Sequence, residues 1–138
     1  MEESIKAGRS FTDCCREKLN LKETDPALYS PLALAYMGDA VYEVIVRAMV
    51  MNQGNMQVNK MHKKSAELVK ATTQARLIRL LEPELTREEE AVFKRGRNAR
   101  SATVAKHASV ADYRTATGLE ALAGYLYLSE QFERLLEL

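Results

Sequence analysis

The sequence has few of the features of a membrane or secreted protein. No apolar run reaches the length that a membrane-spanning helix needs, and the first ten residues lack the apolar core of a secretory signal. The absence of a signal favours the cytoplasm. The only cysteines, Cys14 and Cys15, are adjacent. Adjacent cysteines rarely form a structural disulfide, and without nearby histidines they do not make a zinc site, so we interpret them as reduced thiols without a function.

The sequence also lacks the pattern of a β-strand. No segment alternates apolar and polar residues for long enough to predict one, and apolar residues recur with helical spacing along most of the chain. There is no internal repeat, low-complexity tract or interdomain linker. With 46% hydrophobic and 28% charged residues, the composition is ordinary for a soluble globular protein. We therefore predict a single all-α domain.

Capping pairs and helix-ending residues set the expected helix boundaries. Thr86 with Glu89 fits a capping box that opens a helix, and Ser109 with Asp112 can cap a later one. The polar and basic residues 94–109 are predicted to form a loop. The spacing predicts helices at residues 11–19, 32–51, 58–71, 73–81, from 86 toward Gly96 or Asn98, and 110–128, with a further turn or helix to 138.

The net charge of +1 hides an uneven distribution. Residues 1–59 carry six basic and eight acidic side chains, residues 60–106 carry twelve and six, and residues 107–138 carry two and five. The middle of the chain is therefore basic between two acidic flanks. This asymmetry favours one surface that binds an anionic partner.

Two carboxylates stand in apolar surroundings. Asp39 follows Gly38 inside AYMGDAVYEVIVRAMV, residues 35–50, and Glu120 lies near two glycines in TGLEALAGYLYL, residues 117–128. A charge in such a stretch lowers stability unless something pairs with it. Glycine usually permits close packing of another backbone, so the two acids would meet if these helices pack together. Adjacent carboxylates resist ionising; a divalent cation relieves this, and oxygen ligands with retained waters suit Mg²⁺.

A structural role is the alternative for each acid. A single Asp or Glu in an amphipathic helix usually lies at the solvent edge or pairs with an arginine. Glu43 has Arg47 one turn later, which fits an ordinary ion pair. Periodicity alone favours the structural role for Asp39 and Glu120 over the metal, and leaves both open.

Four sequence blocks resemble the ribonuclease III family. YMGDAVYE, residues 36–43, resembles the family signature, and LEALAGYLYL, residues 119–128, resembles its second motif. HKKS at residues 62–65 and EEEAVFKRGRNAR at residues 88–100 extend the similarity to the Mini-III ribonucleases, a short-chain subfamily. The resemblance covers about residues 28–135 of a single catalytic domain expected over residues 1–138.

The resemblance implies both a fold and an activity. The expected fold is the helical endonuclease domain of ribonuclease III, a homodimer that sets two active sites across one RNA duplex. The expected activity is Mg²⁺-dependent cleavage of double-stranded RNA to 5′-phosphate and 3′-hydroxyl ends, in the maturation of precursor large-subunit (23S) ribosomal RNA. Asp39 and Glu120 are then the catalytic and metal-binding residues, and Asp39 is expected to be buried facing the metal.

Two departures from the longer enzymes concern the metal site. Those enzymes place a glutamate four residues before the signature aspartate and an aspartate three residues before the second-motif glutamate. This sequence has Ala35 and Thr117 there. The resemblance therefore implies Asp39 and Glu120 but not a full two-metal site.

The basic middle of the chain is expected to bind RNA phosphates. The sequence ends without the double-stranded-RNA-binding domain of the longer enzymes, so the catalytic domain is expected to hold the duplex itself. Aromatic residues do not interleave the basic ones, which disfavours a single-strand stacking platform. His62 is interpreted as a phosphate or hydroxyl contact, not a metal ligand. The expected RNA-binding residues are Lys60, His62, Lys63, Lys64, Lys94, Arg95, Arg97, Asn98 and Arg100.

Two other functions compete with the enzyme. The first is a non-catalytic module of the same fold that binds structured RNA in ribosome assembly, which the missing acids favour. The second is a helical dimerisation domain for a protein partner, which the basic middle segment disfavours. A run of charges is also, most often, only a solvated surface.

Overall fold

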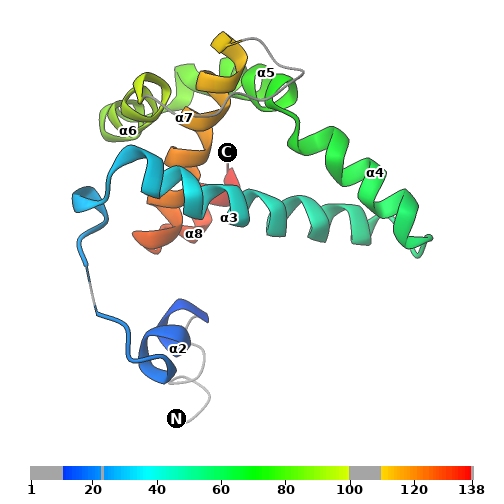
Figure 1. Ribbon diagram of the computed structural model, residues 1–138, viewed down its shortest axis with the longest axis horizontal. Coiled ribbons are helices and arrows are strands. Elements are labelled where there is room, and N and C mark those ends of the chain that lie inside the picture. Colours follow the sequence, from blue (N-terminus) through cyan, green and yellow to red (C-terminus); the bar gives the residue numbers. More distant parts are fainter. Residues whose placement is uncertain (1–10, 23, 100–109, 138) are drawn as a thin grey trace.

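The computed structural model describes residues 11–22, 24–99 and 110–137. In that part of the chain all regular structure is helical and no strand occurs, which confirms the predicted fold class (Figure 1). The α-helices are α2 (Phe11–Lys18), α3 (Pro31–Asn52), α4 (Val58–Val69), α5 (Ala71–Leu81), α6 (Arg87–Asn98), α7 (Val110–Leu128) and α8 (Phe132–Glu137). Two short 3₁₀ turns, Pro26–Leu28 and Glu82–Glu84, precede α3 and α6.

Local capping explains where the central helices begin. Ser30 accepts a hydrogen bond from the Ala33 backbone N–H at 3.2 Å, and Pro31 occupies the first position of α3, where its missing N–H costs nothing. The predicted capping box of α6 is present: Thr86 Oγ1 accepts from the Glu89 N–H at 3.2 Å, and Glu89 Oε1 accepts from the Thr86 N–H at 2.9 Å.

The predicted end of α6 at Gly96 or Asn98 is confirmed at Asn98, whereas the loop predicted for residues 94–109 begins too early. Lys94–Asn98 form the last turns of α6, because Phe93 and Gly96 are buried and this packing holds the polar residues around them in the helix. The remainder, residues 100–109, and the expected cap at Ser109 lie outside the described residues.

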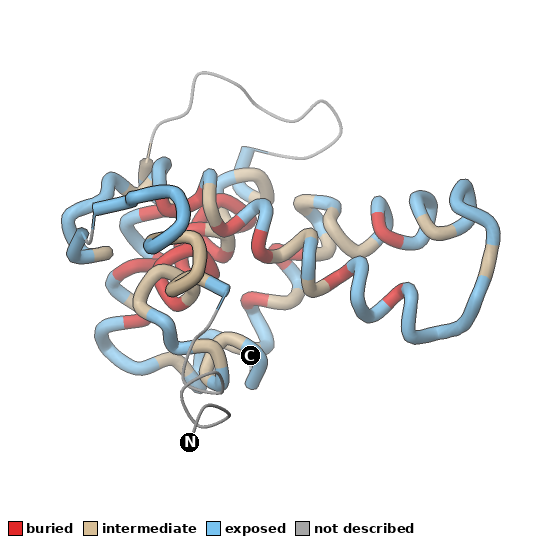
Figure 2. Tube along the Cα trace, turned by 90° about the horizontal axis from the view of Figure 1, so that it is seen from below, coloured by how far each residue is buried: buried red, intermediate tan, exposed pale blue. Residues whose placement is uncertain are grey.

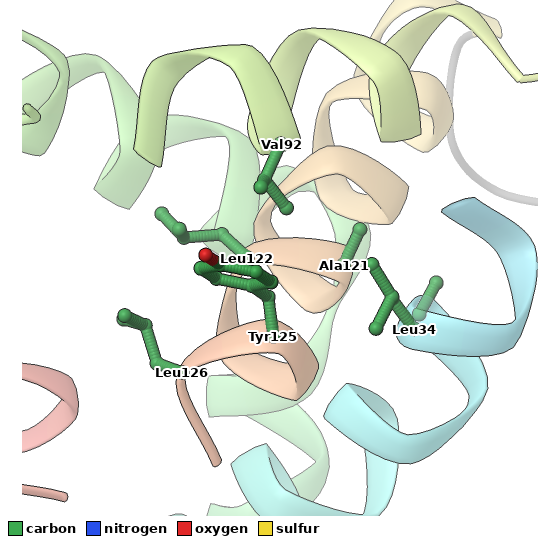
Figure 3. Packing of buried hydrophobic residues seen from close by; sticks show 7 residues of the cluster. Leu34, Val92, Ala121, Leu122, Tyr125 and Leu126 are labelled. Atoms are coloured by element: carbon green, nitrogen blue, oxygen red, sulfur yellow. The ribbon is translucent and has the colours of Figure 1, made fainter. Parts of the chain in front are cut away.

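Helix α7 is the centre of the fold. It packs against α3, α5 and α6, and most of its residues from Ala116 to Leu126 are buried. Figure 3 shows Leu34 of α3 and Val92 of α6 pointing toward the side chains of Ala121 and Leu122. A helix that is apolar on all sides, as α7 nearly is, is expected in such a buried position.

Glycine pairs let α7 approach two of its neighbours closely. A Cβ atom at Gly38 of α3 would overlap the carbonyl oxygen of Glu120 and lie 2.8 Å from the Gly124 nitrogen. On the other side, a Cβ at Gly96 of α6 would lie 3.0 Å from the Gly118 Cα. The predicted role of glycine at these positions, close packing of another backbone, is therefore confirmed.

The second half of α3 and the whole of α4 extend away from the body of the molecule (Figures 1 and 2). We call residues 46–69 the α3–α4 arm. Its two helices pack on each other, with Val50 and Ser65 buried between exposed neighbours. At the other side of the body, α8 is fixed to α6 by Arg134, which donates two 2.8 Å hydrogen bonds to the buried Glu89 carboxylate.

Within the described ranges, none of the helices is both long enough and apolar enough to span a membrane.

Candidate active site

Asp39 and Glu120 meet where α3 crosses α7. The crossing places Gly38, the residue before Asp39, directly on the backbone of Glu120. The side chains are close enough for Asp39 to raise the pKa of Glu120, both by hydrogen bonding and by its negative charge. The expectation that the two acids would come together is therefore confirmed.

The Glu120 carboxyl has a strongly raised pKa of about 8. Burial is the largest cause, because desolvation penalises the charged form, and the neighbouring Asp39 adds to it. Hydrogen bonding from Gln74 acts in the opposite direction. Burial and the neighbouring carboxyl therefore both favour the protonated form of Glu120 in the chain without a cation.

The expectation that Asp39 is buried is wrong for the single chain. Asp39 is exposed, as are its neighbours Tyr36 and Ala40, whereas Glu120 is partly buried. Only one side of α3, which includes Leu34, Gly38 and Val41, faces the core, and Asp39 lies beside that side, not on it. The two carboxyls therefore have unequal environments, one solvated and one largely desolvated.

Two uncharged polar side chains complete the surroundings of Glu120. Gln74 of α5 is only 2% exposed, and its Nε2 donates to the Val69 carbonyl at 3.2 Å. Tyr42 of α3 donates its hydroxyl to the Leu68 carbonyl at 3.0 Å. Burial raises the Tyr42 pKa, and the charge of Glu120 raises it further.

Sequence reasoning missed Gln74 and Tyr42 as parts of the site. Gln74 shares a buried stripe with Ala75 and Ile78, so it is a polar residue at an apolar position, which is the same kind of anomaly that revealed Asp39 and Glu120. Because glutamine is neutral, the anomaly is easily overlooked. The polar residue at an apolar helix position was the feature of the sequence from which Gln74 could have been identified.

At the two positions where longer enzymes carry further acids, this chain has uncharged residues that contribute to packing. Ala35 belongs to the main hydrophobic core, and Thr117 is buried and donates its hydroxyl to the Tyr113 carbonyl at 2.9 Å. In the described part of the chain no cluster of three or more His, Cys, Asp or Glu side chains could hold a metal. Among the described residues, the crossing therefore brings two carboxylates together without a third His, Cys, Asp or Glu to complete a metal cluster.

The donor set at the crossing suits a hydrated divalent cation. Two neighbouring carboxyls disfavour each other's ionisation, and a divalent cation bound between them would remove that penalty. Mg²⁺ commonly binds through one or two carboxylates and keeps several waters, so a third protein acid is not required. Asp39 and Glu120 are the residues that would hold it.

Glu43 and Arg47 form the ion pair expected from their spacing. Arg47 Nη2 lies 3.2 Å from Glu43 Oε1. The other carboxylate oxygen, Oε2, is shielded from solvent and accepts no hydrogen bond from the described residues. The pair stands on α3 one turn beyond Asp39 and is interpreted as structural.

The predicted RNA-binding residues of α4 lie on the α3–α4 arm. Lys60, His62 and Lys63 are exposed. Lys64 is exposed as well and donates to Gln53 Oε1 at 3.0 Å, across the turn between α3 and α4. The arm therefore presents basic side chains to solvent.

The remaining predicted RNA-binding residues are on α6. Lys94 pairs with Glu90 at 2.6 Å, and Arg95 is exposed. Arg97 stacks its guanidinium over the Phe93 ring at 5.6 Å and contacts Asn98 Oδ1 at 3.4 Å. Arg100 lies outside the described residues. The α4 and α6 groups are at opposite ends of α3 (Figure 1), so one chain does not bring them together.

Comparison with known proteins agrees with this geometry. The Ribonuclease III domain family matches residues 32–131, which include both acids. Mini-ribonuclease 3 of Clostridium tetani is 51% identical over 132 residues, covering 95% of this chain and 81% of the relative. Mini-ribonuclease 3 of Symbiobacterium thermophilum is 44% identical over 117 residues, covering 85% and 90%.

A solved structure is similar over most of its length. The crystal structure of a Fusobacterium nucleatum protein has a TM-score of 0.76 and 29% sequence identity, and the match covers 83% of this chain and 91% of that one. With the matched family domain and the Mini-ribonuclease 3 relatives, these similarities establish that the chain belongs to the ribonuclease III family of endoribonucleases.

Proposed function

We propose that this protein is a Mg²⁺-dependent endoribonuclease that cleaves double-stranded RNA. The observation that carries the proposal is the meeting of Asp39 and Glu120 at a glycine-mediated helix crossing, inside a Ribonuclease III domain. The domain supplies the reaction class. The acid pair supplies the place where a cation and a phosphodiester would be held.

The residues of the chain have distinct parts in this proposal. Asp39 and Glu120 would hold the cation, directly or through waters. Bound there, Mg²⁺ would neutralise the two carboxylates, lower the pKa of an attacking water and stabilise charge on the phosphate. Burial around Glu120 keeps bulk water from one side of the pair, and the exposed side at Asp39 admits the RNA backbone. The products are a 5′-phosphate and a 3′-hydroxyl.

The homodimer expected from the family is part of the proposal. One exposed face of α3 carries Tyr36, 82% exposed, and Val44, 68% exposed, together with Ala40 and Met51. Asp39 borders this apolar face. A two-fold partner on it would cover the apolar side chains and bring two acid pairs onto one duplex. Such a partner would also shield Asp39, which the single chain leaves exposed.

The basic groups of α4 and α6 would then act as the RNA-holding surfaces. Their separation within one chain, at opposite ends of α3, fits a duplex that spans two subunits. Phosphate contacts by lysine and arginine supply affinity without base readout, which suits an A-form duplex recognised by shape. Precursor 23S ribosomal RNA is the substrate that the resemblance favours, which would place the enzyme in the cytoplasm and in ribosome biogenesis.

A non-catalytic RNA-binding module of the same fold is the second candidate. The uncharged Ala35 and Thr117 favour it, because they leave two acids where longer enzymes have four. One incubation separates the candidates: long duplex RNA with the protein, with and without Mg²⁺. The proposed enzyme should produce RNA fragments with 5′-phosphates only when Mg²⁺ is present. A non-catalytic module would bind the duplex and leave it intact in both conditions.

A further inference from the structure

Gln74 is the most completely buried polar side chain beside the acid pair. It lies on α5 with 2% of its surface exposed, at a position where the helix otherwise buries Ala75 and Ile78. Burying an amide costs free energy unless its donors and acceptor are satisfied. The position therefore calls for a reason beyond packing.

The nitrogen and the oxygen of the Gln74 side-chain amide differ in their hydrogen bonding. Its nitrogen, which carries two N–H donors, donates to the Val69 carbonyl at 3.2 Å and interacts with the Glu120 carboxyl. Its oxygen, Oε1, is shielded from solvent and accepts no hydrogen bond from the described residues. An oriented donor thus faces Glu120, while the acceptor beside it receives no hydrogen bond from the part of the chain that the structure describes.

The contact with Val69 fixes the orientation of this amide. Val69 is the last residue of α4, and its carbonyl is one of the groups that a helix end leaves without an intrahelical partner. Because one N–H of the Gln74 amide donates to the Val69 carbonyl, the other N–H is directed toward Glu120. An amide rotated by 180° would lose the Val69 hydrogen bond and set an oxygen against a carbonyl oxygen.

We propose that Gln74 is a positioning residue for the metal site: its N–H orients Glu120 toward Asp39, and its Oε1 accepts a hydrogen bond from a water of the bound divalent cation. The inference rests on the proposed function, since it needs the cation at the acid pair. Groups that orient a ligand and hold coordinated water typically change metal affinity 10- to 100-fold when they are removed, by the general behaviour of such outer contacts.

A purely structural role is the competing explanation, and Thr73 provides the matched control. Thr73 is the neighbour of Gln74 in the chain, and its hydroxyl donates to the Glu67 carbonyl at 2.9 Å, also near the end of α4. Thr73→Val and Gln74→Met each remove one hydrogen bond to that end of the helix. Only Gln74→Met removes the amide beside Glu120.

The test measures Mn²⁺ binding to RNA-free protein by the loss of the free-ion electron paramagnetic resonance signal. The expected result is a dissociation constant about 10-fold or more weaker for Gln74→Met, with Thr73→Val within about twofold of the unmodified protein. Equal affinities for Gln74→Met and unmodified protein would overturn the inference. Glu120→Gln run in parallel separates the claims: if it loses Mn²⁺ and Gln74→Met does not, only the role of Gln74 fails.

A second measurement needs no substitution at Gln74. In ¹⁵N-labelled unmodified protein, the side-chain amide resonances of Gln74, assigned through contacts with Val69, should shift on addition of Mg²⁺ and saturate with the metal. They should stay in place in Glu120→Gln. Resonances that do not move in the unmodified protein while it binds Mg²⁺ would contradict the proposal, whether or not Gln74→Met folds.

Discussion

Gly38 of α3 lies against the backbone of α7 so closely that a methyl group there would overlap the Glu120 carbonyl oxygen and lie 2.8 Å from the Gly124 nitrogen. The reverse contact holds as well, since a Cβ at Gly124 would overlap the Leu34 carbonyl. The two glycines therefore set the distance between the helices. That distance in turn brings the side chain after Gly38, Asp39, to Glu120.

Gly38→Ala is expected to destabilise the protein by about 1–3 kcal/mol, because the clash is with backbone that can yield only if the helices move apart. At an open helix position the same change would stabilise by roughly 1 kcal/mol through helix propensity, so the sign of the effect is informative. Urea unfolding would measure it. A gain in stability would show that the helices do not meet at these glycines.

The stability of metal-free protein is expected to fall as the pH rises from about 5 to 8. Glu120 has its pKa raised from 4.5 to about 8, so between these values the folded chain holds a proton that the unfolded chain has released. Rising pH therefore favours unfolding, by roughly 1–4 kcal/mol in total, and the effect levels off above pH 8.

Glu120→Gln is the control for this pH dependence, because its neutral amide should remove most of the slope. Mg²⁺ should also reduce the slope in the unmodified protein, since cation binding favours the ionised pair. Thermal unfolding across pH 5–9, with and without Mg²⁺, checks both expectations. A slope that is unchanged in Glu120→Gln would assign it to other groups.

The sequence predicted the helices and the acid pair well, and the reasons are local. The limits of α7 match the prediction at both ends, and the capping box at Thr86 formed as expected. Asp39 and Glu120 were identifiable because each is a charge in an apolar stretch. Their meeting followed from the glycines, which mark where backbones touch.

Other features could not be predicted because they depend on tertiary packing. Helix α3 is apolar on nearly all sides, so its sequence does not show which side faces α7, and the exposure of Asp39 was missed. The sequence left the end of the helix open between Gly96 and Asn98 and also allowed a loop from Lys94; the burial of Phe93 and Gly96 against α7 decides for the helix. Gln74 becomes part of the site only through the packing of α5 on α7.

The exposed apolar face of α3 leads to a prediction on oligomeric state. Light scattering at micromolar concentration should report twice the 15.5 kDa mass of one chain. Val44→Lys should shift the protein toward monomer, because it places a charge in the centre of that face. Leu80→Lys, at a 72% exposed position on α5, serves as the matched control and should leave the mass unchanged. A monomeric unmodified protein that cuts both strands together would contradict the dimer.

The basic residues of α6 and α4 should make binding of duplex RNA strongly dependent on salt. In a Glu120→Gln background, replacing Arg95, Arg97 and Arg100 with alanine should weaken binding and flatten the plot of log affinity against log salt, by roughly one unit of slope per lost phosphate contact. Replacing Lys60, Lys63 and Lys64 should act similarly.

Two exposed lysines outside these groups, Lys18 and Lys22, provide a control for the loss of basic charge elsewhere on the surface. Their replacement with alanine should leave the slope nearly unchanged. Equal slopes for all the variants would show that the α4 and α6 groups are solvated surface and that the RNA lies elsewhere.

The most direct test of the account is the rate at which Asp39→Asn and Glu120→Gln cleave long duplex RNA in Mg²⁺. Each change removes one negative ligand oxygen with little change in size, so cleavage should fall by at least about 100-fold while circular dichroism stays that of the folded protein. Asp112→Asn, a carboxylate of α7 that pairs with Arg79 instead, should cleave normally. Cleavage at the unmodified rate by either Asp39→Asn or Glu120→Gln would contradict the assignment of the active site.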